Sequence, residues 1–209
     1  MSVTSLLASS LGHTDEQANI AVAEVIVTDK NVKGVRELVE LLNGKDKALK
    51  SDGLKALCEV GVRAPELIAP FLASFKNLLA STDTRMVWGA MCAIDMITSV
   101  KPEAVYMMLP QIMAAVDKGS VITRDHAVKA LVKLAGEERF AMTTVPLLLE
   151  QLSSAPVNQL PMYAELIAPV LKGGGAKELI AVLSQRLADM PTPAKRKRVE
   201  KVLKQLAKQ

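Results

Sequence analysis

The sequence predicts an all-α protein built from stacked pairs of helices, and three observations lead to this prediction. Half of the 209 residues are apolar, whereas Phe, Tyr and Trp together make up only 3%. A core of Leu, Ala, Val, Ile and Met suits helices packed on helices better than a β-sandwich. Similar segments also recur along the chain, and in each of them the apolar pattern divides into two helices joined by a short polar turn.

The repeated segments begin at Leu41, Leu78 and Ala115, so the period is 37 residues. A fixed period of this length indicates an array in which each unit packs mainly on its neighbours. The positions that keep their offset are the apolar pairs Ala56-Leu57, Ala93-Ile94 and Ala130-Leu131 and the small residues Gly53, Ala90 and Ala127.

Extending the period in both directions gives about six units within a single domain, residues 1–209. The approximate units are residues 1–30, 32–63, 65–100, 102–137, 140–172 and 175–208. In the first four units, the expected helix pairs are residues 2–10 with 14–28, 32–42 with 46–60, 65–80 with 83–99, and 102–116 with 120–135.

Local signals support several of these boundaries. Thr14 and Gln17 have the spacing of a capping box at the start of a helix. Pro65 and Pro102 stand at the first helical position, where the missing N–H of proline costs nothing.

The last two units are less regular. Prolines at positions 156, 161 and 169 predict a kinked or interrupted second helix in the fifth unit, because an internal proline removes a hydrogen bond and clashes with the preceding turn. The run Gly173 to Gly175 predicts a break before the sixth unit.

The pattern resembles HEAT repeats over nearly the whole chain. The resemblance rests on prolines inside the first helices, as at Pro70, Pro110 and Pro146, on the Ala-Leu pairs, and on basic residues early in the second helices, Lys50 and Arg124. It implies a right-handed α-solenoid of about six HEAT-like helix pairs. Its second helices would line a concave face of the kind that commonly binds proteins and sometimes nucleic acid.

Trp88, the single tryptophan, falls in an expected second helix. At about 100° per residue, Met86, Val87, Ala90, Ile94 and Ile97 gather on one side, which we expect to be buried. Trp88 falls on the opposite side together with Arg85, Cys92 and Asp95. It is therefore either an anchor for a partner on the concave face or a ring that fills the seam between two repeats.

The repeat brings further residues beside Trp88, since positions 37 residues apart lie side by side on neighbouring second helices. The candidate partner-binding residues are Ser51, Lys55, Arg85, Trp88, Cys92, Asp95, Asp125 and Lys129. They make a mixed polar surface around one aromatic ring.

The charge is concentrated at the end of the chain. Residues 173–209 hold nine Lys and Arg against three Asp and Glu, whereas the net charge of the whole chain is +4. The helix expected at residues 194–208 is either a polar cap on the last repeat or an electrostatic patch for nucleic acid, an acidic protein or an anionic membrane surface. The candidate basic patch consists of Lys195, Arg196, Lys197, Arg198, Lys201 and Lys204.

No sequence motif predicts catalysis, a cofactor or a metal ion. His13 and His126 are far apart in the array, and Cys58 and Cys92 stand in separate apolar segments, where we expect free buried thiols. HEAT-like DNA glycosylases use tryptophans and an aspartate on the concave face, but this chain has one tryptophan. We therefore do not expect an enzyme.

The sequence has no apolar run long enough to span a bilayer and no basic stretch before Leu6 that would mark a signal peptide, so we expect a cytoplasmic protein that is not inserted in a membrane. The preferred hypothesis is a scaffold that binds a protein partner on its concave face. The alternative is nucleic-acid binding through the basic terminal helix and basic residues of the concave face.

Overall fold

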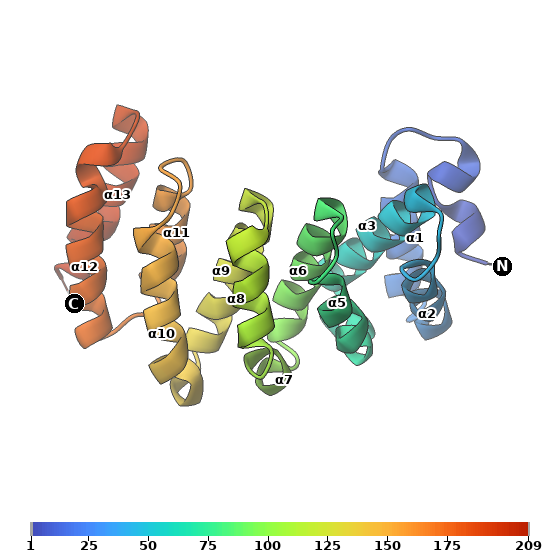
Figure 1. Cartoon of the computed structure of the whole chain (residues 1–209), viewed down its shortest axis with the longest axis horizontal. Helices are drawn as coiled ribbons and strands as arrows, with labels where there is room; N and C mark the ends of the chain where they lie inside the picture. Colours follow the sequence, from blue (N-terminus) through green and yellow to red (C-terminus); the bar gives the residue numbers. More distant parts are fainter. Residues whose placement is uncertain (1, 209) are drawn as a thin grey trace. The chain divides into compact units, whose positions relative to one another are not determined.

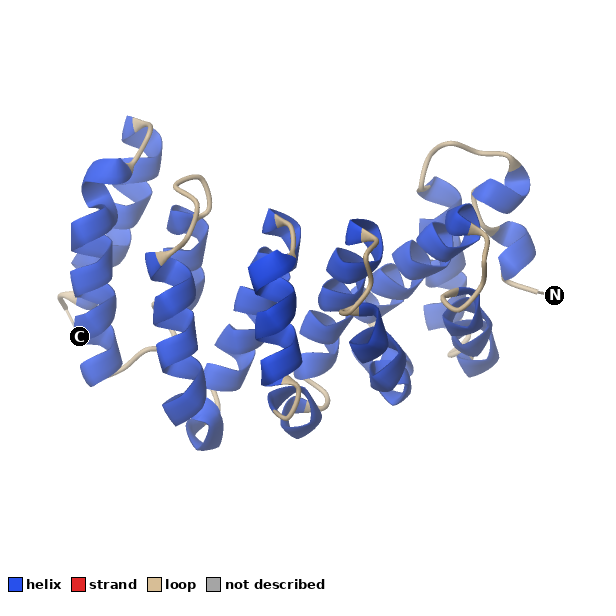
Figure 2. Ribbon diagram, in the orientation of Figure 1, coloured by secondary structure: helices blue, strands red, loops and turns tan. Residues whose placement is uncertain are grey.

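The computed structural model describes residues 2–208, and this part of the chain contains helices and no strand (Figures 1 and 2). Met1, where the expected domain and its first unit begin, and Gln209, where the expected domain ends, lie outside the described residues. The chain forms two compact units, one that runs to Ala127 and one that begins at Val128.

The first unit begins with two short 3-10 turns, Thr4–Leu6 and Ser9–Leu11, and continues with α-helices. The helices are α1 (Gln17–Thr28), α2 (Val32–Leu41), α3 (Lys47–Arg63), α4 (Pro65–Ile68), α5 (Leu72–Leu78), α6 (Thr84–Thr98), α7 (Pro102–Tyr106), α8 (Leu109–Lys118) and the start of α9 (Val121–Ala135).

Helix α3 is the centre of the first unit. It packs between α1 and α6, which are second helices of the neighbouring pairs, while α2 and α4 cover another side of it. Leu54 and Leu57 of α3 and Ile94 of α6 lie in the core between them. The expected alternation of first and second helices is therefore present in this unit.

Glycine lets α6 approach α3 closely. A Cβ atom at Gly89 would lie 2.4 Å from Cδ2 and 2.7 Å from Cγ of Leu54, distances that real Cβ atoms do not show. Gly61 of α3 has a similar role, since a Cβ there would lie 2.7 Å from Cδ1 of Ile68 and 3.3 Å from Cβ of Met96. Leu54 of α3 thus packs directly on the backbone of α6, and Met96 of α6 packs directly on the backbone of α3.

Prolines break the first helices that the sequence predicted as continuous. The helix expected at residues 65–80 is divided into α4, a 3-10 turn over Ala69–Phe71, and α5, with Pro70 in that turn. The helix expected at residues 102–116 is divided into α7 and α8, with Pro110 in the first turn of α8. A proline cannot donate the helical hydrogen bond, so the preceding turn ends or tightens.

Two expectations near the N-terminus are corrected. The first expected helix, residues 2–10, forms 3-10 turns instead of an α-helix. The capping box at Thr14 and Gln17 does not form, because α1 begins at Gln17 itself, whose N–H donates to the Asp15 carboxylate at 2.8 Å. Asp46 and Asp83 do cap helices: their carboxylates accept hydrogen bonds from the first N–H groups of α3 and α6.

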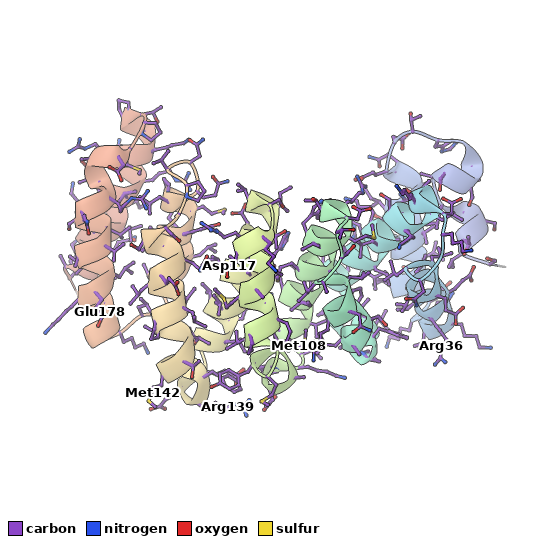
Figure 3. All side chains as sticks on the ribbon, viewed as in Figure 1. Arg36, Met108, Asp117, Arg139, Met142 and Glu178 are labelled. Atoms are coloured by element: carbon purple, nitrogen blue, oxygen red, sulfur yellow. The ribbon has the colours of Figure 1, made fainter. Side chains whose placement is uncertain are left out.

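The second unit contains the end of α9 and the helices α10 (Glu138–Ser153), α11 (Leu160–Ile167), α12 (Gly174–Arg186) and α13 (Pro193–Leu206). Here α10 packs on α12 and α11 packs on α13. Met142 on α10 is 88% exposed (Figure 3).

Helix α11 is short rather than kinked. Pro161 lies in its first turn, where proline is tolerated, and the helix ends at Ile167, two residues before Pro169. The break after it is the expected glycine run: Gly173 has a φ of +56°, a left-handed conformation that favours glycine, and α12 begins at the next residue.

Side chains also join segments that are distant in sequence. Arg186 at the end of α12 donates to the carbonyls of Ser153 and Ala155 at 2.5 and 2.9 Å, which satisfies carbonyl groups at the C-terminal end of α10. Among residues 2–208, no helix combines the length and the apolar character that crossing a membrane requires.

Candidate functional site

Trp88 lies on α6 and is half-buried. The guanidinium carbon of Arg85, one turn earlier on the same helix, lies 5.7 Å from the centroid of the Trp88 ring, within the range of a cation–π contact. Gly89, the next residue, is at the close contact between α6 and α3. The ring therefore lies beside the seam between two second helices, and part of its surface is accessible.

The helical wheel is confirmed for the buried side of α6 but not for its opposite side. All five residues expected to be buried are buried: Met86, Val87, Ala90, Ile94 and Ile97. Cys92 and Asp95, expected beside Trp88 on the surface, are also buried, with exposed fractions of 8% and 0%. These two residues cannot contact a partner, and we remove them from the candidate partner-binding set.

Cys92 and Asp95 are buried because α6 is enclosed by more than its own first helix. It packs against α3, α4, α5 and α7, and His126 of α9 reaches one of its side chains. A second helix in the middle of an array is covered by neighbours on both flanks, so only a narrow stripe stays accessible. On α6 that stripe contains Arg85 and Trp88.

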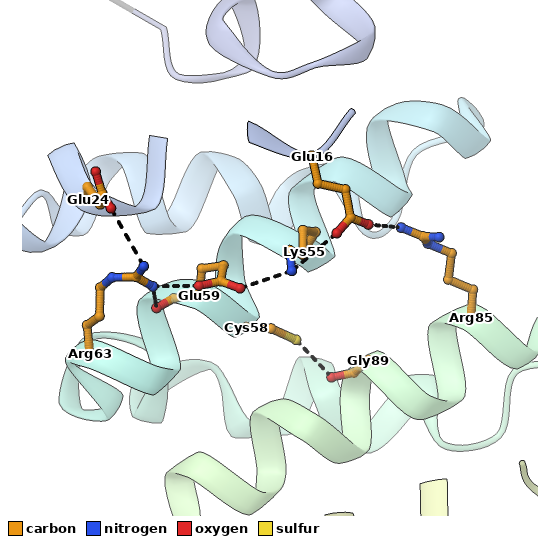
Figure 4. A network of polar contacts seen from close by, with 8 residues as sticks. All are labelled: Glu16, Glu24, Lys55, Cys58, Glu59, Arg63, Arg85 and Gly89. Atoms are coloured by element: carbon orange, nitrogen blue, oxygen red, sulfur yellow. Dashed lines mark hydrogen bonds and ion pairs between the residues drawn. The ribbon is translucent and has the colours of Figure 1, made fainter. Parts of the chain in front are cut away.

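A chain of ion pairs runs along α3 and reaches Arg85 of α6 (Figure 4). Glu16 accepts from Arg85 at 2.9 Å and pairs with Lys55 at 3.2 Å, so one carboxylate links α6 to α3. Lys55 also pairs with Glu59 at 3.0 Å, and Glu59 pairs with Arg63 at 2.6 Å.

The pKa values follow from these contacts. Burial alone would lower the pKa of Lys55, but its hydrogen bonds to Glu59 and Glu16 outweigh burial and raise it. Burial would raise the pKa of Glu59, but Arg63 and Lys55 hold it below its usual range. With Arg63 also pairing with Glu24 at 3.7 Å, the chain of ion pairs contains three acids and three bases. Its net charge is zero.

The other candidates lie on the neighbouring second helices. Ser51 of α3 is half-buried, as are Asp125 and Lys129 of α9. Asp125 belongs to the first unit and Lys129 to the second, because α9 crosses the boundary after Ala127.

Beneath this surface the structure joins four side chains that the sequence did not connect. Nδ1 of His126 lies 2.8 Å from Oδ2 of Asp95, and the His126 imidazole is also hydrogen-bonded to the thiol of Cys92. The Cys92 sulfur neighbours that of Cys58. The Cys58 thiol donates its hydrogen to the carbonyl of Gly89 at 3.3 Å (Figure 4). We call Cys58, Cys92, Asp95 and His126 the thiol–histidine cluster.

Within the thiol–histidine cluster, Cys92 carries the negative charge and His126 the positive charge. The neighbouring Cys58 thiol and the His126 imidazole lower the pKa of Cys92 to about 5, although burial opposes the change. Burial would lower the pKa of His126, but its hydrogen bonds to Asp95 and Cys92 raise it to about 9. The pKa of Cys58 rises, chiefly because the Cys92 sulfur is its neighbour and because Cys58 is buried. The cluster thus favours a Cys92 thiolate beside a His126 imidazolium.

Three of the four residues of the thiol–histidine cluster are evenly spaced in the sequence. Cys58, Cys92 and His126 follow one another at intervals of 34 residues, three fewer than the repeat of 37. Three residues are about one helical turn, so each of these residues lies one turn earlier on the next second helix. These residues form a diagonal row across the second helices. An alignment that compares only equivalent positions of the 37-residue repeat does not bring them together.

A cleft of about 620 Å³ in the first unit lies elsewhere. It is lined by the ends of α5 and α8 and the turn before α6, including Lys76, Thr82, Gln111 and Lys118. In the described part of the chain, no group of three or more His, Cys, Asp and Glu has an arrangement suited to a metal ion.

The basic patch lies on α13, and part of its charge is neutralised. Arg198 forms a bidentate pair with Glu165 of α11, at 2.8 and 2.6 Å, and Arg196 pairs with Glu200 at 3.1 Å. Lys195 donates to Asn158. The remaining members, Lys197, Lys201 and Lys204, are exposed.

No protein-family model and no curated protein matches the sequence. Solved structures do match nearly its whole length. A designed armadillo repeat protein in complex with the peptide (KR)4 is 14% identical, with a TM-score of 0.66 over 98% of this chain and 99% of that one. An engineered protein is 20% identical, with a TM-score of 0.62 over 99% and 96% of the two chains.

The archaeal HEAT-like repeats protein from Thermococcus onnurineus NA1 is 14% identical to this chain, with a TM-score of 0.55 over 100% of this chain and 98% of that one. Identities this low establish a common fold and no shared activity. The protein therefore has a HEAT/armadillo-like repeat fold, an all-helical α-solenoid.

Proposed function

We propose that the protein is a non-enzymatic scaffold that binds an extended segment of a protein partner across its second helices, on the face that the HEAT resemblance makes concave. The observation that carries the proposal is the half-buried ring of Trp88, which has an accessible surface beside Arg85 in a helix whose residues 89–95 are all buried. A partly exposed aromatic ring surrounded by polar groups is typical of an interface anchor.

Residues on both sides of Trp88 would supply the polar part of this surface. We propose that the partner contacts Ser51, Lys55, Arg85, Trp88, Asp125 and Lys129. The ion pairs around Lys55 and Arg85 hold these long side chains in place before binding, which lowers the entropy cost of ordering them.

The fold supports a peptide as the ligand, because a designed armadillo repeat protein of this fold was solved in complex with a (KR)4 peptide. We do not carry the basic character of that peptide to this chain. The acids and bases beside Trp88 balance, so we propose a segment of mixed charge with an apolar side chain that packs on the indole.

Peptides selected from a random display library on the intact protein test the proposal. For such a peptide, we expect Trp88→Ala to raise the Kd at least tenfold, about 1.4 kcal/mol, because the anchor is lost, and Trp88→Phe to recover part of the affinity. Since Trp88 is the single tryptophan, its emission in the wild type should also change on binding.

The matched control is Met107→Ala, which removes a side chain that is 75% exposed and lies outside the second helices. It should leave the Kd unchanged, and all three variants should keep the helical circular dichroism of the wild type. Peptides that bind Trp88→Ala as tightly as the wild type would show that the interface is elsewhere. Loss of helical signal in Trp88→Ala and Trp88→Phe alike would make the ring a packing residue.

We place this scaffold in the cytoplasm. Both cysteines are free in the structure and their thiols are adjacent, an arrangement suited to a reducing compartment.

A further inference from the structure

The thiol–histidine cluster contains both cysteines of the chain, and no sequence motif accounts for it. Cys58 comes from α3, Cys92 and Asp95 from α6, and His126 from α9, so three successive second helices supply it. Its polar atoms are connected in one line from Gly89 through the two sulfurs and the imidazole to Asp95. Core packing alone does not require such a line.

We infer that the thiol–histidine cluster is an oxidation site, in which a peroxide converts Cys92 to a sulfenic acid and Cys58 then closes a disulfide that links α3 to α6. The three requirements of this chemistry are an ionised thiol, a proton donor beside it, and a second thiol within reach. Each requirement corresponds to one contact of the cluster.

The contact between Cys92 and His126 meets the first two requirements. An imidazolium beside a thiol favours the thiolate, which is the nucleophilic form, and Asp95 stabilises the imidazolium and fixes its orientation through Nδ1. Lys55 and Glu59 of α3 also face the cluster, and they oppose one another in their effect on the pKa of Cys58.

The contact between the two sulfurs meets the third requirement. Gly89 allows α6 to approach α3 so closely that the Cys58 sulfur reaches the α6 backbone at 3.3 Å. Cys58 is therefore held against the helix that carries Cys92, as a resolving cysteine must be.

Access restricts the oxidant to a small molecule. Cys58 and Cys92 are 7% and 8% exposed, and the side chain of His126 is 17% exposed. Hydrogen peroxide is small enough for such an opening, whereas a protein thiol or a bulky disulfide is not. The same restriction argues against a role for Cys92 as the nucleophile of a hydrolase.

The two steps balance without a further reagent. The Cys92 thiolate attacks one oxygen of hydrogen peroxide, the O–O bond breaks, and the departing hydroxide takes a proton from His126 to give water and a Cys92 sulfenic acid. The Cys58 sulfur then attacks the Cys92 sulfur, its thiol proton leaves with the sulfenic hydroxyl as a second water, and the disulfide forms. Peroxide gains the two electrons that the thiols lose, and an external dithiol reverses the change.

The test is titration of the intact, reduced protein with hydrogen peroxide, followed by denaturation, thiol counting and intact-mass measurement. We expect both thiols to disappear together, with a mass loss of two hydrogen atoms and full reversal by dithiothreitol. In Cys58→Ser, Cys92 should accumulate as a sulfenic acid that dimedone traps. In Cys92→Ser, Cys58 should react at least about tenfold more slowly than Cys92 does in the wild type, because it lacks the imidazolium.

The variant His126→Gln tests whether the imidazole activates Cys92 or whether the two cysteines are merely adjacent. It keeps both thiols and should slow their oxidation about tenfold or more, while Lys47→Gln, which removes a charge at an exposed position of α3, should leave the rate near that of the wild type. Circular dichroism checks that each variant is folded. The proposal is overturned if both thiols persist in peroxide, if the product is an intermolecular dimer, or if His126→Gln reacts as fast as the wild type.

Discussion

Glu37 shows how one residue can hold a terminus. Its carboxylate accepts the backbone N–H groups of Val3 and Thr4 at 3.1 and 3.0 Å, and the hydroxyls of Thr4 and Ser2 also donate to it. Burial alone would raise the pKa of Glu37, but these hydrogen bonds, led by the one from Ser2, lower it to about 2. The ionised carboxylate therefore joins the N-terminal turns to α2.

We expect Glu37→Gln to lower the free energy of unfolding by roughly 1–2 kcal/mol, because the charge-assisted hydrogen bonds become neutral ones. The pKa of Glu37 is lower in the folded state than its ordinary value of 4.5, so its contribution is complete above pH 4.5 and is lost as the pH falls towards about 2. Urea unfolding measured at several pH values in this range should show that the free energy of unfolding of the wild type falls as the pH falls. In the variant this dependence on pH should be smaller.

Glu40→Gln is the matched control, since Glu40 is an exposed residue of the same helix. Its unfolding free energy should stay within about 0.5 kcal/mol of the wild type. Equal stability of Glu37→Gln and Glu40→Gln at neutral pH would mean that the N-terminal turns are not held by this carboxylate.

At the scale of elements, the close contact between α3 and α6 depends on Gly89. In an isolated helix, Gly→Ala stabilises by about 1 kcal/mol, because glycine loses more backbone freedom on folding. Here the added methyl group would overlap Leu54, which is 2% exposed and has little room to move. We expect Gly89→Ala to destabilise the protein by roughly 1–3 kcal/mol, as overpacking does.

Gly174→Ala, measured in the same thermal or urea unfolding experiment, is the control for this prediction. A Cβ at Gly174 meets nothing within 4 Å, so the substitution should be neutral within about 0.5 kcal/mol or slightly stabilising. A stabilising Gly89→Ala would show that helix propensity outweighs the contact, and that α3 and α6 are farther apart than the structure has them.

For the whole molecule, the alternative function makes a separate prediction. Two of the six basic-patch residues, Arg196 and Arg198, are already in ion pairs, and Trp88 lies in the other compact unit from α13. We therefore expect duplex DNA at about 0.15 M salt to leave the emission of Trp88 and its quenching by acrylamide unchanged.

A DNA-dependent shift of the emission would instead support nucleic-acid binding through the second helices, and the affinity should then fall steeply with salt. Strong binding at low salt without any shift would limit the contact to the basic patch. Charge reversal at Lys201 and Lys204, both exposed on α13, would test that second outcome.

Much of the array is predictable from local patterns. The second helices α3 and α6 begin at aspartate caps and stay within a few residues of their expected bounds, because capping and apolar periodicity are properties of adjacent residues. The first helices are less predictable. Pro70 and Pro110 divide them, and the sequence does not show whether a proline in a helical pattern will bend, shorten or interrupt the helix.

At the candidate site, some features follow from local sequence patterns and others only from the packing of neighbouring helices. The sequence by itself determined the helix pairs, their period, the buried side of α6 and the position of Trp88 opposite that side, because each follows from residues within one or two turns. Only the tertiary structure decided that Cys92 and Asp95 are covered and that Cys58, Cys92 and His126 meet in a diagonal row. These depend on how far neighbouring helices slide and how closely they approach, which Gly89 permits and no single helix encodes.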